Sequence, residues 1–289
     1  MTRTTRRSAR LAVWVAVAWT GLASAWAAEA EQGGGSPARG FSGRHATWNG
    51  YDQFHFTVDG RNAYVVVPKQ AAPGRPWVWR ARFPNYHAEM DVALLGKGFH
   101  IAYLDVAGLF GCPQAMDHAE KFYRLLTAEH GLAPKPALEG VSRGGLFVYN
   151  WAARNPDKVA CIYADTPVCD FKSWPGGRGK GIGSAPAWAA CLKAYGLSEP
   201  EALSYPGNPI DTLAPIASAK IPMLHVVSEN DRVVPPAENT YLLKERLEKL
   251  GGSTEIISVT KGTPQSNGHH FEHPDPEKVV AFILRHTAG

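Results

Sequence analysis

The sequence predicts an α/β protein with a mostly parallel central sheet and helices on both faces of it. Short apolar segments alternate with longer amphipathic segments over most of the chain. Such alternation is typical of βαβ units, because parallel strands need a crossover connection. With 289 residues, 45% of them hydrophobic and 19% charged, the chain can bury a large core. These values exclude general disorder and a small disulfide-stapled scaffold.

Two β-like stretches come first, at residues 51–58 and 62–67, and a series of apolar strands follows them. Short apolar runs bounded by Gly, Pro or polar residues suit strands that are buried on both faces. We expect these strands at residues 77–83, 100–106, 136–141, 159–164, 223–228 and 255–259.

The amphipathic segments between the strands predict helices at residues 87–96, 113–130, 144–155, 236–250 and 276–286. In the fourth of these, Leu243, Leu247 and Leu250 follow the spacing of one helix face, and two glycines end the run. The last helix has Asp275 as a suitable N-cap and Pro276 at its first position.

Residues 170–220 interrupt this alternation with a Gly- and Pro-rich insertion that holds one helix-like piece at 187–195. Insertions of this length in a compact domain are usually functional, so we expect a lid-like segment. Trp174 is the substrate-binding residue that we expect in it, with Trp188 as a second indole for stacking on a sugar or an aromatic acyl group. Burial of both tryptophans in an ordinary core is the alternative.

The N-terminal 27 residues have the features of a removable signal peptide. A basic stretch (1–10) precedes an apolar stretch (11–23), and Ala-Trp-Ala at 25–27 suits a cleavage site. The apolar run is too short for a comfortable membrane span, so we expect no stable span after its removal; a retained anchor is the alternative. The sequence therefore predicts a periplasmic or secreted protein, with a linker at residues 28–45.

The charge balance argues against a nucleic-acid partner. Four of the 30 Lys and Arg residues lie in the first ten positions, and the 26 that remain are balanced by 26 Asp and Glu residues. Without a surplus of positive charge, electrostatic attraction to phosphates is absent.

The cysteines, in an exported protein, face an oxidising compartment where disulfides are permitted. Their four positions allow three complete pairings, among which the sequence does not choose. Cys161 lies in an apolar strand and suits a buried free thiol. The positions are Cys112, Cys161, Cys169 and Cys191.

Residues 140–144 read G-V-S-R-G, follow a predicted strand and open a predicted helix. A serine on such a sharp turn projects above the sheet, and the flanking glycines relieve crowding around it. The N-terminus of the following helix directs N–H groups toward a reacting carbonyl. The pattern therefore predicts Ser142 as a nucleophile, with an ordinary strand–helix turn as the alternative.

This motif and its context resemble the α/β-hydrolase superfamily, specifically secreted esterases related to its dienelactone-hydrolase and prolyl-oligopeptidase branches. The resemblance covers roughly residue 63 to the C-terminus. It implies the α/β-hydrolase fold and a catalytic triad in the order serine, acid, histidine. A serine hydroxyl needs such a base, oriented by an acid, to become a nucleophile.

The resemblance assigns the acid to Asp231, which follows the strand at 223–228 and precedes a helix. Glu229 and Asp165 are the alternatives. We expect a solvent-exposed loop aspartate if Asp231 has no catalytic role.

The same resemblance assigns the base to His269, because the superfamily usually places its histidine directly after a glycine in this loop. His270 is the competing candidate, and His273 is a weaker one. These residues could also be metal ligands, but they lack the H-E-x-x-H order and a helical setting. We therefore expect no metal and no cofactor.

A developing oxyanion needs two donors, which we expect to be the N–H of Arg143 and an N–H of the loop after strand 77–83. Pro84 has no N–H, so Phe83 is preferred, with Asn85 and Tyr86 as alternatives. Tyr86 is also expected to contact substrate. The Arg143 guanidinium is expected to bind a substrate carboxylate, with a surface salt bridge or another structural role as the alternative. Glucuronoyl esterases also carry an arginine after their serine, so a uronate-bearing ester is a minority hypothesis.

The sequence thus predicts an exported serine hydrolase that cleaves carboxylic esters through an acyl-enzyme on Ser142. Small acyl esters and carbohydrate-linked esters are the expected substrates. A prolyl-oligopeptidase-like serine peptidase is one alternative. A non-catalytic binding protein on the hydrolase fold is another, because a fold does not by itself imply a function.

Overall fold

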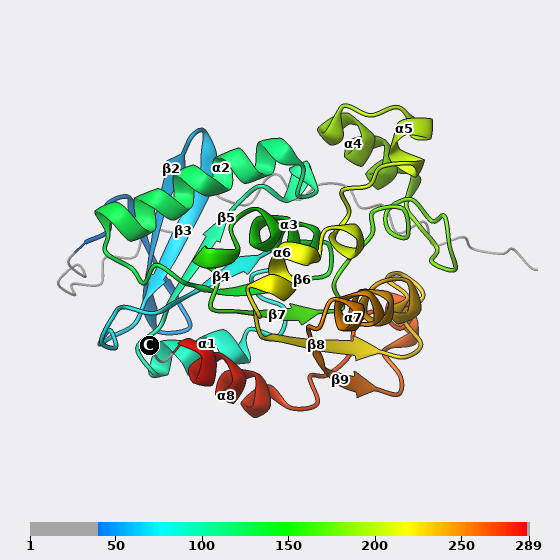
Figure 1. Cartoon of the computed structure of the whole chain (residues 1–289). Coiled ribbons are helices and arrows are strands. Elements are labelled where there is room, and N and C mark those ends of the chain that lie inside the picture. The colour runs from blue at the N-terminus through cyan, green and yellow to red at the C-terminus, as the bar shows by residue number, and fades with distance from the viewer. Residues whose placement is uncertain (1–39, 288–289) are drawn as a thin grey trace, which may run out of the picture. The chain divides into compact units, whose positions relative to one another are not determined.

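The computed structural model describes residues 40–287, whose strands form one nine-stranded sheet in the order β1-β2-β3-β5-β4-β6-β7-β8-β9 (Figure 1). The ladders β1–β2, β2–β3 and β3–β5 are antiparallel, and every ladder from β5 to β9 is parallel. The strands are β1 (Arg44–Trp48), β2 (Tyr51–Val58), β3 (Arg61–Val67), β4 (Trp77–Ala81), β5 (His100–Leu104), β6 (Ala137–Val141), β7 (Cys161–Asp165), β8 (Met223–Ser228) and β9 (Glu255–Val259). The predicted, mostly parallel sheet is confirmed.

Helices cover both faces of this sheet, as the sequence predicted (Figure 1). One face packs against α1 and α8, the other against α2, α3 and α7. Side chains alternate accordingly: in β4, Trp77 and Trp79 face the second set, whereas Val78 faces the first. The helices are α1 (Glu89–Gly96), α2 (Pro113–Arg124), α3 (Gly144–Arg154), α7 (Thr240–Lys249) and α8 (Pro276–Thr287).

Element boundaries differ from the predicted ones where the backbone changes conformation. β4 ends at Ala81 because Arg82 and Phe83 take left-handed φ values of 73° and 44°. The helix expected to end at residue 130 continues as a π-helical segment (Leu125–Glu129) after α2. β1 begins at Arg44, inside the segment that we expected to be a linker.

The insertion between β7 and β8 contains α4 (Ala185–Tyr195), α5 (Glu199–Leu203) and α6 (Ala214–Ser218); the sequence predicted only the first. Trp188 is buried in a small apolar cluster around Phe171, which is the core role that we weighed as the alternative. The Asn239 side chain accepts the Cys169 N–H at 2.8 Å and so fixes the start of the insertion. The structure does not confirm a lid.

All four cysteines lie within the described residues, and all four are buried free thiols. They belong to three separate apolar clusters, which accounts for the absence of pairing between Cys161 and the others. Among residues 40–287, no helix is both long enough and apolar enough to cross a bilayer. The expected signal peptide lies outside the described residues.

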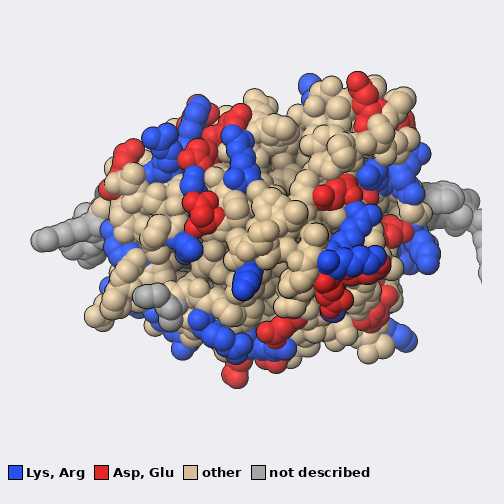
Figure 2. Space-filling view, viewed as in Figure 1, with Lys and Arg blue, Asp and Glu red and all other residues tan. Residues whose placement is uncertain are grey.

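Acidic and basic side chains are interspersed on the face shown in Figure 2, including the part formed by α7. On that helix, Lys244 pairs with Glu248 and Lys249 pairs with Glu245 at i, i+4 spacing. Exposed pairs of this kind contribute little to stability, because solvent screens the two charges. The fold therefore depends on its apolar clusters.

The leucines of α7 offer a direct test of this. Leu247 is fully buried, whereas Leu250 is 49% exposed because the helix ends at Lys249. We predict that Leu247→Ala lowers the free energy of unfolding by about 2–5 kcal/mol, since it removes buried methyl groups and leaves a cavity. Leu250→Ala should change it by about 0.5 kcal/mol or less. Urea denaturation measures both, and equal losses would contradict this assignment of the core.

Candidate active site

Ser142 lies on the tight turn between β6 and α3 in a left-handed conformation, with φ of 51°. Its N–H donates to the Asp165 carbonyl at 2.8 Å, and its carbonyl accepts the Val168 N–H at 2.9 Å. A left-handed conformation is costly for a residue with a side chain and persists only where the surroundings enforce it. These bonds to the end of β7 and the segment after it supply that enforcement.

The glycines around Ser142 are required by close packing. A Cβ on Gly144 would lie 2.2 Å from the Ala81 carbonyl oxygen, and one on Gly145 would lie 2.6 Å from the Val168 carbonyl oxygen. Backbone atoms cannot shift easily to relieve such a steric overlap. Gly144 therefore lets the N-terminus of α3 approach the end of β4, where the second oxyanion donor is expected.

Ser142, His269 and Asp231 form a continuous hydrogen-bonded chain. His269 Nε2 lies 3.0 Å from Ser142 Oγ, and His269 Nδ1 lies 2.6 Å from Asp231 Oδ2. Because a carboxylate only accepts, Nδ1 carries the proton, which leaves Nε2 free to accept the Ser142 proton. The Asp231 side chain is fully buried and that of His269 is 9% exposed.

Local turns hold the acid and the histidine in place. The second oxygen of Asp231 accepts the N–H groups of Val233 and Val234 at 2.8 and 2.9 Å. Gly268 has φ of 86°, and a Cβ there would lie 2.3 Å from the Asn230 carbonyl oxygen. A glycine directly before His269 is therefore a geometric requirement for bringing the histidine loop against the acid loop.

The other histidines of this loop have different partners. His270 is exposed, and its ring lies against Tyr86 at a centroid distance of 5.2 Å. His273 Nδ1 accepts the Asp275 N–H at 3.1 Å, so its Nε2–H donates to the Tyr163 hydroxyl at 3.0 Å. Within residues 40–287, no set of three His, Cys, Asp or Glu side chains is placed to hold a metal ion.

The alternative acids are also engaged elsewhere. Glu229 is exposed and accepts the Tyr241 hydroxyl. The Asp165 carboxylate lies 2.5 Å from Nδ1 of His87, a residue that sequence reasoning did not single out. Of the residues weighed from the sequence, the structure thus brings together Ser142, His269 and Asp231.

The expected oxyanion donors lie on the two segments that Gly144 brings into contact. Arg143 precedes α3, whose first N–H groups have no partner within the helix. In the loop after β4, the Tyr86 N–H donates to the Phe83 carbonyl at 3.1 Å. Tyr86 is therefore not available as an oxyanion donor. The Asn85 side chain accepts the Trp48 indole N–H at 3.0 Å. The assignment of the Phe83 N–H stays a prediction.

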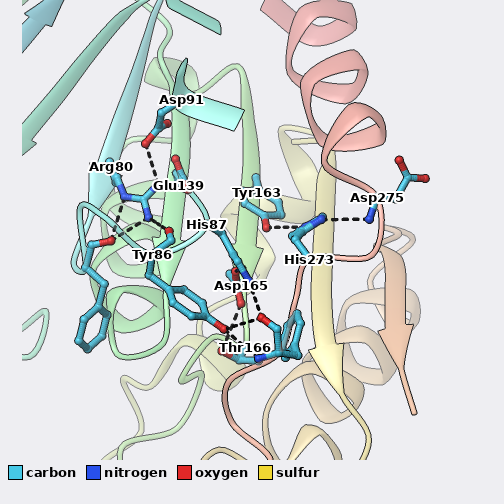
Figure 3. Close-up of polar contacts among 12 residues, drawn as sticks. Arg80, Tyr86, His87, Asp91, Glu139, Tyr163, Asp165, Thr166, His273 and Asp275 are labelled. Carbon is cyan, nitrogen blue, oxygen red and sulfur yellow. Dashed lines mark hydrogen bonds and ion pairs between the residues drawn. The ribbon is translucent and has the colours of Figure 1, made fainter. Parts of the chain in front are cut away.

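A buried arginine in β4 holds this loop (Figure 3). One nitrogen of the Arg80 guanidinium donates to Asp91 and to Glu139, at 2.7 Å each. The remaining N–H groups donate to the carbonyl oxygens of Phe83 and Tyr86. Every donor of the guanidinium is thereby used, and the residue is 1% exposed.

The two carboxylates beside Arg80 do not both need to be charged. Burial raises the pKa of Glu139 well above its usual range, and the neighbouring Asp91 raises it further, although Arg80 opposes both effects. The protonated form of Glu139 is therefore favoured relative to an ordinary glutamate, which reduces the surplus of negative charge around Arg80.

Tyr86 and His87, on the loop that Arg80 holds, form hydrogen bonds with the loop that contains His269 (Figure 3). The Phe271 N–H donates to the Tyr86 hydroxyl at 3.2 Å, and the Phe271 carbonyl lies 2.8 Å from His87 Nε2. Tyr86 thus links two loops through its hydroxyl, and the expectation that it contacts substrate remains a prediction. Trp174, the other expected substrate residue, is partly buried beside Arg143.

Sequence reasoning missed Arg80, Arg82 and His87. Arg80 had a usable signal, because a charged residue inside an apolar strand must have buried partners. Asp91 and Glu139 lie in apolar elements in the same way. His87 and Arg82 carry no comparable signal, since polar residues are ordinary in a strand–helix loop.

No protein-family profile matches the sequence, and no curated protein matches it significantly. Solved structures similar to this chain include a Mycobacterium tuberculosis puromycin-hydrolyzing peptidase (16% identity, TM-score 0.63, 82% of this chain and 40% of that chain). Pyrococcus horikoshii acylaminoacyl peptidase is also similar (17%, 0.58, 81% and 41%), as is Porphyromonas gingivalis dipeptidyl peptidase 4 (14%, 0.61, 83% and 36%). This chain therefore spans about two fifths of the length of these proteins. Their likeness shows that it has the α/β-hydrolase fold, as the sequence predicted.

The protonation of His87 gives a pH-dependent prediction. Both of its ring nitrogens face acceptors, Asp165 and the Phe271 carbonyl, so the contacts need the imidazolium form. Burial alone would lower the pKa of His87, but the hydrogen bond and charge of Asp165 outweigh it and raise the pKa. The resulting stabilisation is complete below about pH 6.5, the usual histidine pKa, and is lost as pH rises through the raised value.

We therefore predict that His87→Asn, which suits the left-handed backbone there, destabilises the protein more at about pH 5.5 than at about pH 9. Urea denaturation at both pH values measures the difference in the free energy of unfolding from wild type. Asp165→Asn removes the charge that faces His87, so it should also destabilise the protein more at the lower pH. A loss that is the same at both pH values would show that His87 is neutral in the folded protein.

Proposed function

We propose that this chain, which has the α/β-hydrolase fold, is a serine hydrolase that forms an acyl-enzyme on Ser142. The observation that carries the proposal is the hydrogen-bonded chain from Ser142 through His269 to Asp231, at 3.0 and 2.6 Å. A buried acid that orients a histidine whose free nitrogen meets a serine hydroxyl is the arrangement that activates a nucleophile.

In the proposed mechanism, His269 Nε2 takes the Ser142 proton as Oγ attacks the acyl carbonyl carbon. Asp231 stabilises the imidazolium, and the N–H groups of Arg143 and Phe83 hold the negative oxygen of the tetrahedral intermediate. The imidazolium then protonates the leaving group as its bond to the acyl carbon breaks. Water then attacks the acyl carbon as His269 takes its proton, and the imidazolium returns a proton to Ser142 Oγ as the Oγ–acyl bond breaks and the acid leaves.

The solved structures with this fold favour the peptidase alternative over the ester hydrolysis that we predicted from the sequence, since those reported above are named as peptidases. We therefore propose hydrolysis of peptide or related amide bonds as the leading activity. Cleavage of small acyl or carbohydrate-linked esters is the second candidate, because the same acyl-enzyme serves both reactions.

We also propose that the mature chain is exported, to the periplasm or beyond the cell. The support is the order of basic, apolar and small residues in the first 27 positions.

A matched substrate pair tests the proposal: a p-nitroanilide and a p-nitrophenyl ester that carry the same N-acylated amino acid. Ser142→Ala and His269→Ala should each lower kcat/KM for both by roughly 10⁴–10⁶-fold, since the triad acts as a unit. His270→Ala is the control and should retain activity, because its exposed ring contacts neither Ser142 nor Asp231 in the hydrogen-bonded chain. Circular dichroism checks that each variant is folded.

The outcomes separate the candidates. Turnover of the anilide that depends on Ser142 supports the peptidase proposal, and ester turnover with no anilide turnover returns the function to the esterase. An inactive His270→Ala beside an active His269→Ala would move the base by one residue. Activity that survives Ser142→Ala would exclude the acyl-enzyme mechanism.

A further inference from the structure

Two arginine side chains line one pocket beside the nucleophile turn. Arg143 follows Ser142 directly, and Arg82 follows the end of β4, which Gly144 brings against the same helix N-terminus. The pocket is lined by residues of both segments, of β5 and of the loop that follows β5. The lining includes Ala81, Arg82, Tyr103, Phe110, Arg143 and Gly144.

Both arginines are partly buried, and neither guanidinium has an ion-pair partner among the described residues. The Nε atoms of Arg82 and Arg143 are buried without a hydrogen-bond partner. Among residues 40–287, none of the ion pairs includes either arginine. Arg80, two residues before Arg82, uses all of its donors. Unmet donors in a folded protein need an explanation.

The two cations also repel each other. Burial lowers the pKa of Arg143 to about 10, and the charge of Arg82 contributes to this. Arg143 therefore remains charged at neutral pH. Asp105 attracts Arg143, but it is exposed and its carboxylate accepts the Ala107 N–H at 3.4 Å. An anion placed between the guanidinium groups would offset both the repulsion and the desolvation.

Aromatic rings also lie against both guanidinium groups. Arg143 Cζ lies 4.9 Å from the Phe110 ring centroid and 5.9 Å from that of Trp174. Arg82 Cζ lies 4.5 Å from the Phe83 ring centroid, and its guanidinium donates one hydrogen bond to the Tyr103 hydroxyl. Stacking on rings occupies the planar faces of a guanidinium and leaves its N–H edges for a ligand.

We propose that Arg82 and Arg143 form a subsite for a substrate carboxylate, so that the preferred substrates carry a free carboxylate close to the scissile carbonyl. This rests on the proposed function and extends the expectation for Arg143 to a pair of arginines. A planar carboxylate matches the edge of a guanidinium. The carboxylate belongs either to the acyl group or to the leaving group.

Two pairs of esters distinguish a carboxylate in the acyl group from one in the leaving group. Mono-p-nitrophenyl glutarate against p-nitrophenyl butyrate places the charge in the acyl group, and 4-acetoxybenzoate against phenyl acetate places it in the leaving group. Wild type should prefer the charged member of one pair. Arg82→Met should reduce that preference roughly tenfold to hundredfold, the usual range for charge-assisted hydrogen bonds. Arg154→Met, a change at the exposed far end of α3, should leave the preference intact.

A wild type that shows no preference in either pair, or an Arg82→Met variant that keeps it, would overturn the subsite. Failure of the proposed function looks different: no ester would be turned over through Ser142. In that case, calorimetric titration of Ser142→Ala with glutarate and with benzoate tests the subsite alone. Binding that disappears in the Arg82→Met double variant supports it, and the absence of binding to Ser142→Ala overturns it.

Discussion

The arrangement of this site depends on the buried guanidinium of Arg80. It is anchored in β4, balanced by Asp91 and Glu139, and bonded to the backbone carbonyls of Phe83 and Tyr86. Breaking a buried pair of this kind typically costs about 3–5 kcal/mol, because the remaining charge is left uncompensated. A loop with left-handed residues is thereby held against the N-terminus of α3, where Ser142 lies. The same arginine therefore pairs with the buried carboxylates and positions the loop beside Ser142.

A second set of contacts extends this constraint to the base. Tyr86 and His87, on the loop that Arg80 fixes, both bind the backbone of Phe271, two residues after His269. Asp165 joins the set from β7, since its carboxylate binds His87 while its backbone carbonyl accepts the Ser142 N–H. Serine and histidine are far apart in the sequence, yet both are positioned by the same few residues at the carboxyl ends of the strands. Preorganisation of this kind is what the proposed acyl transfer requires.

Local patterns made much of this predictable. The G-x-S-x-G motif at 140–144 and the glycine before His269 are features of short segments, so sequence alone located both and the strands that carry them. The cluster around Arg80 is not local: its partners lie 11 and 59 residues away, and only the folded sheet brings them together. β1 was missed because residues 44–48 show little apolar alternation and lie at the edge of the sheet. Pairings such as that of His87 with Asp165 depend on register and loop conformation, which periodicity does not specify.

The central claim is that Ser142 is an activated nucleophile in the folded protein. Labelling with a fluorophosphonate, followed by intact-mass and peptide mapping, tests it without assuming any substrate. The account predicts a single adduct on Ser142, which disappears in His269→Ala and persists in His270→Ala. A folded protein that takes up no label, or takes it up at another residue, would contradict the account and favour a binding role for this fold.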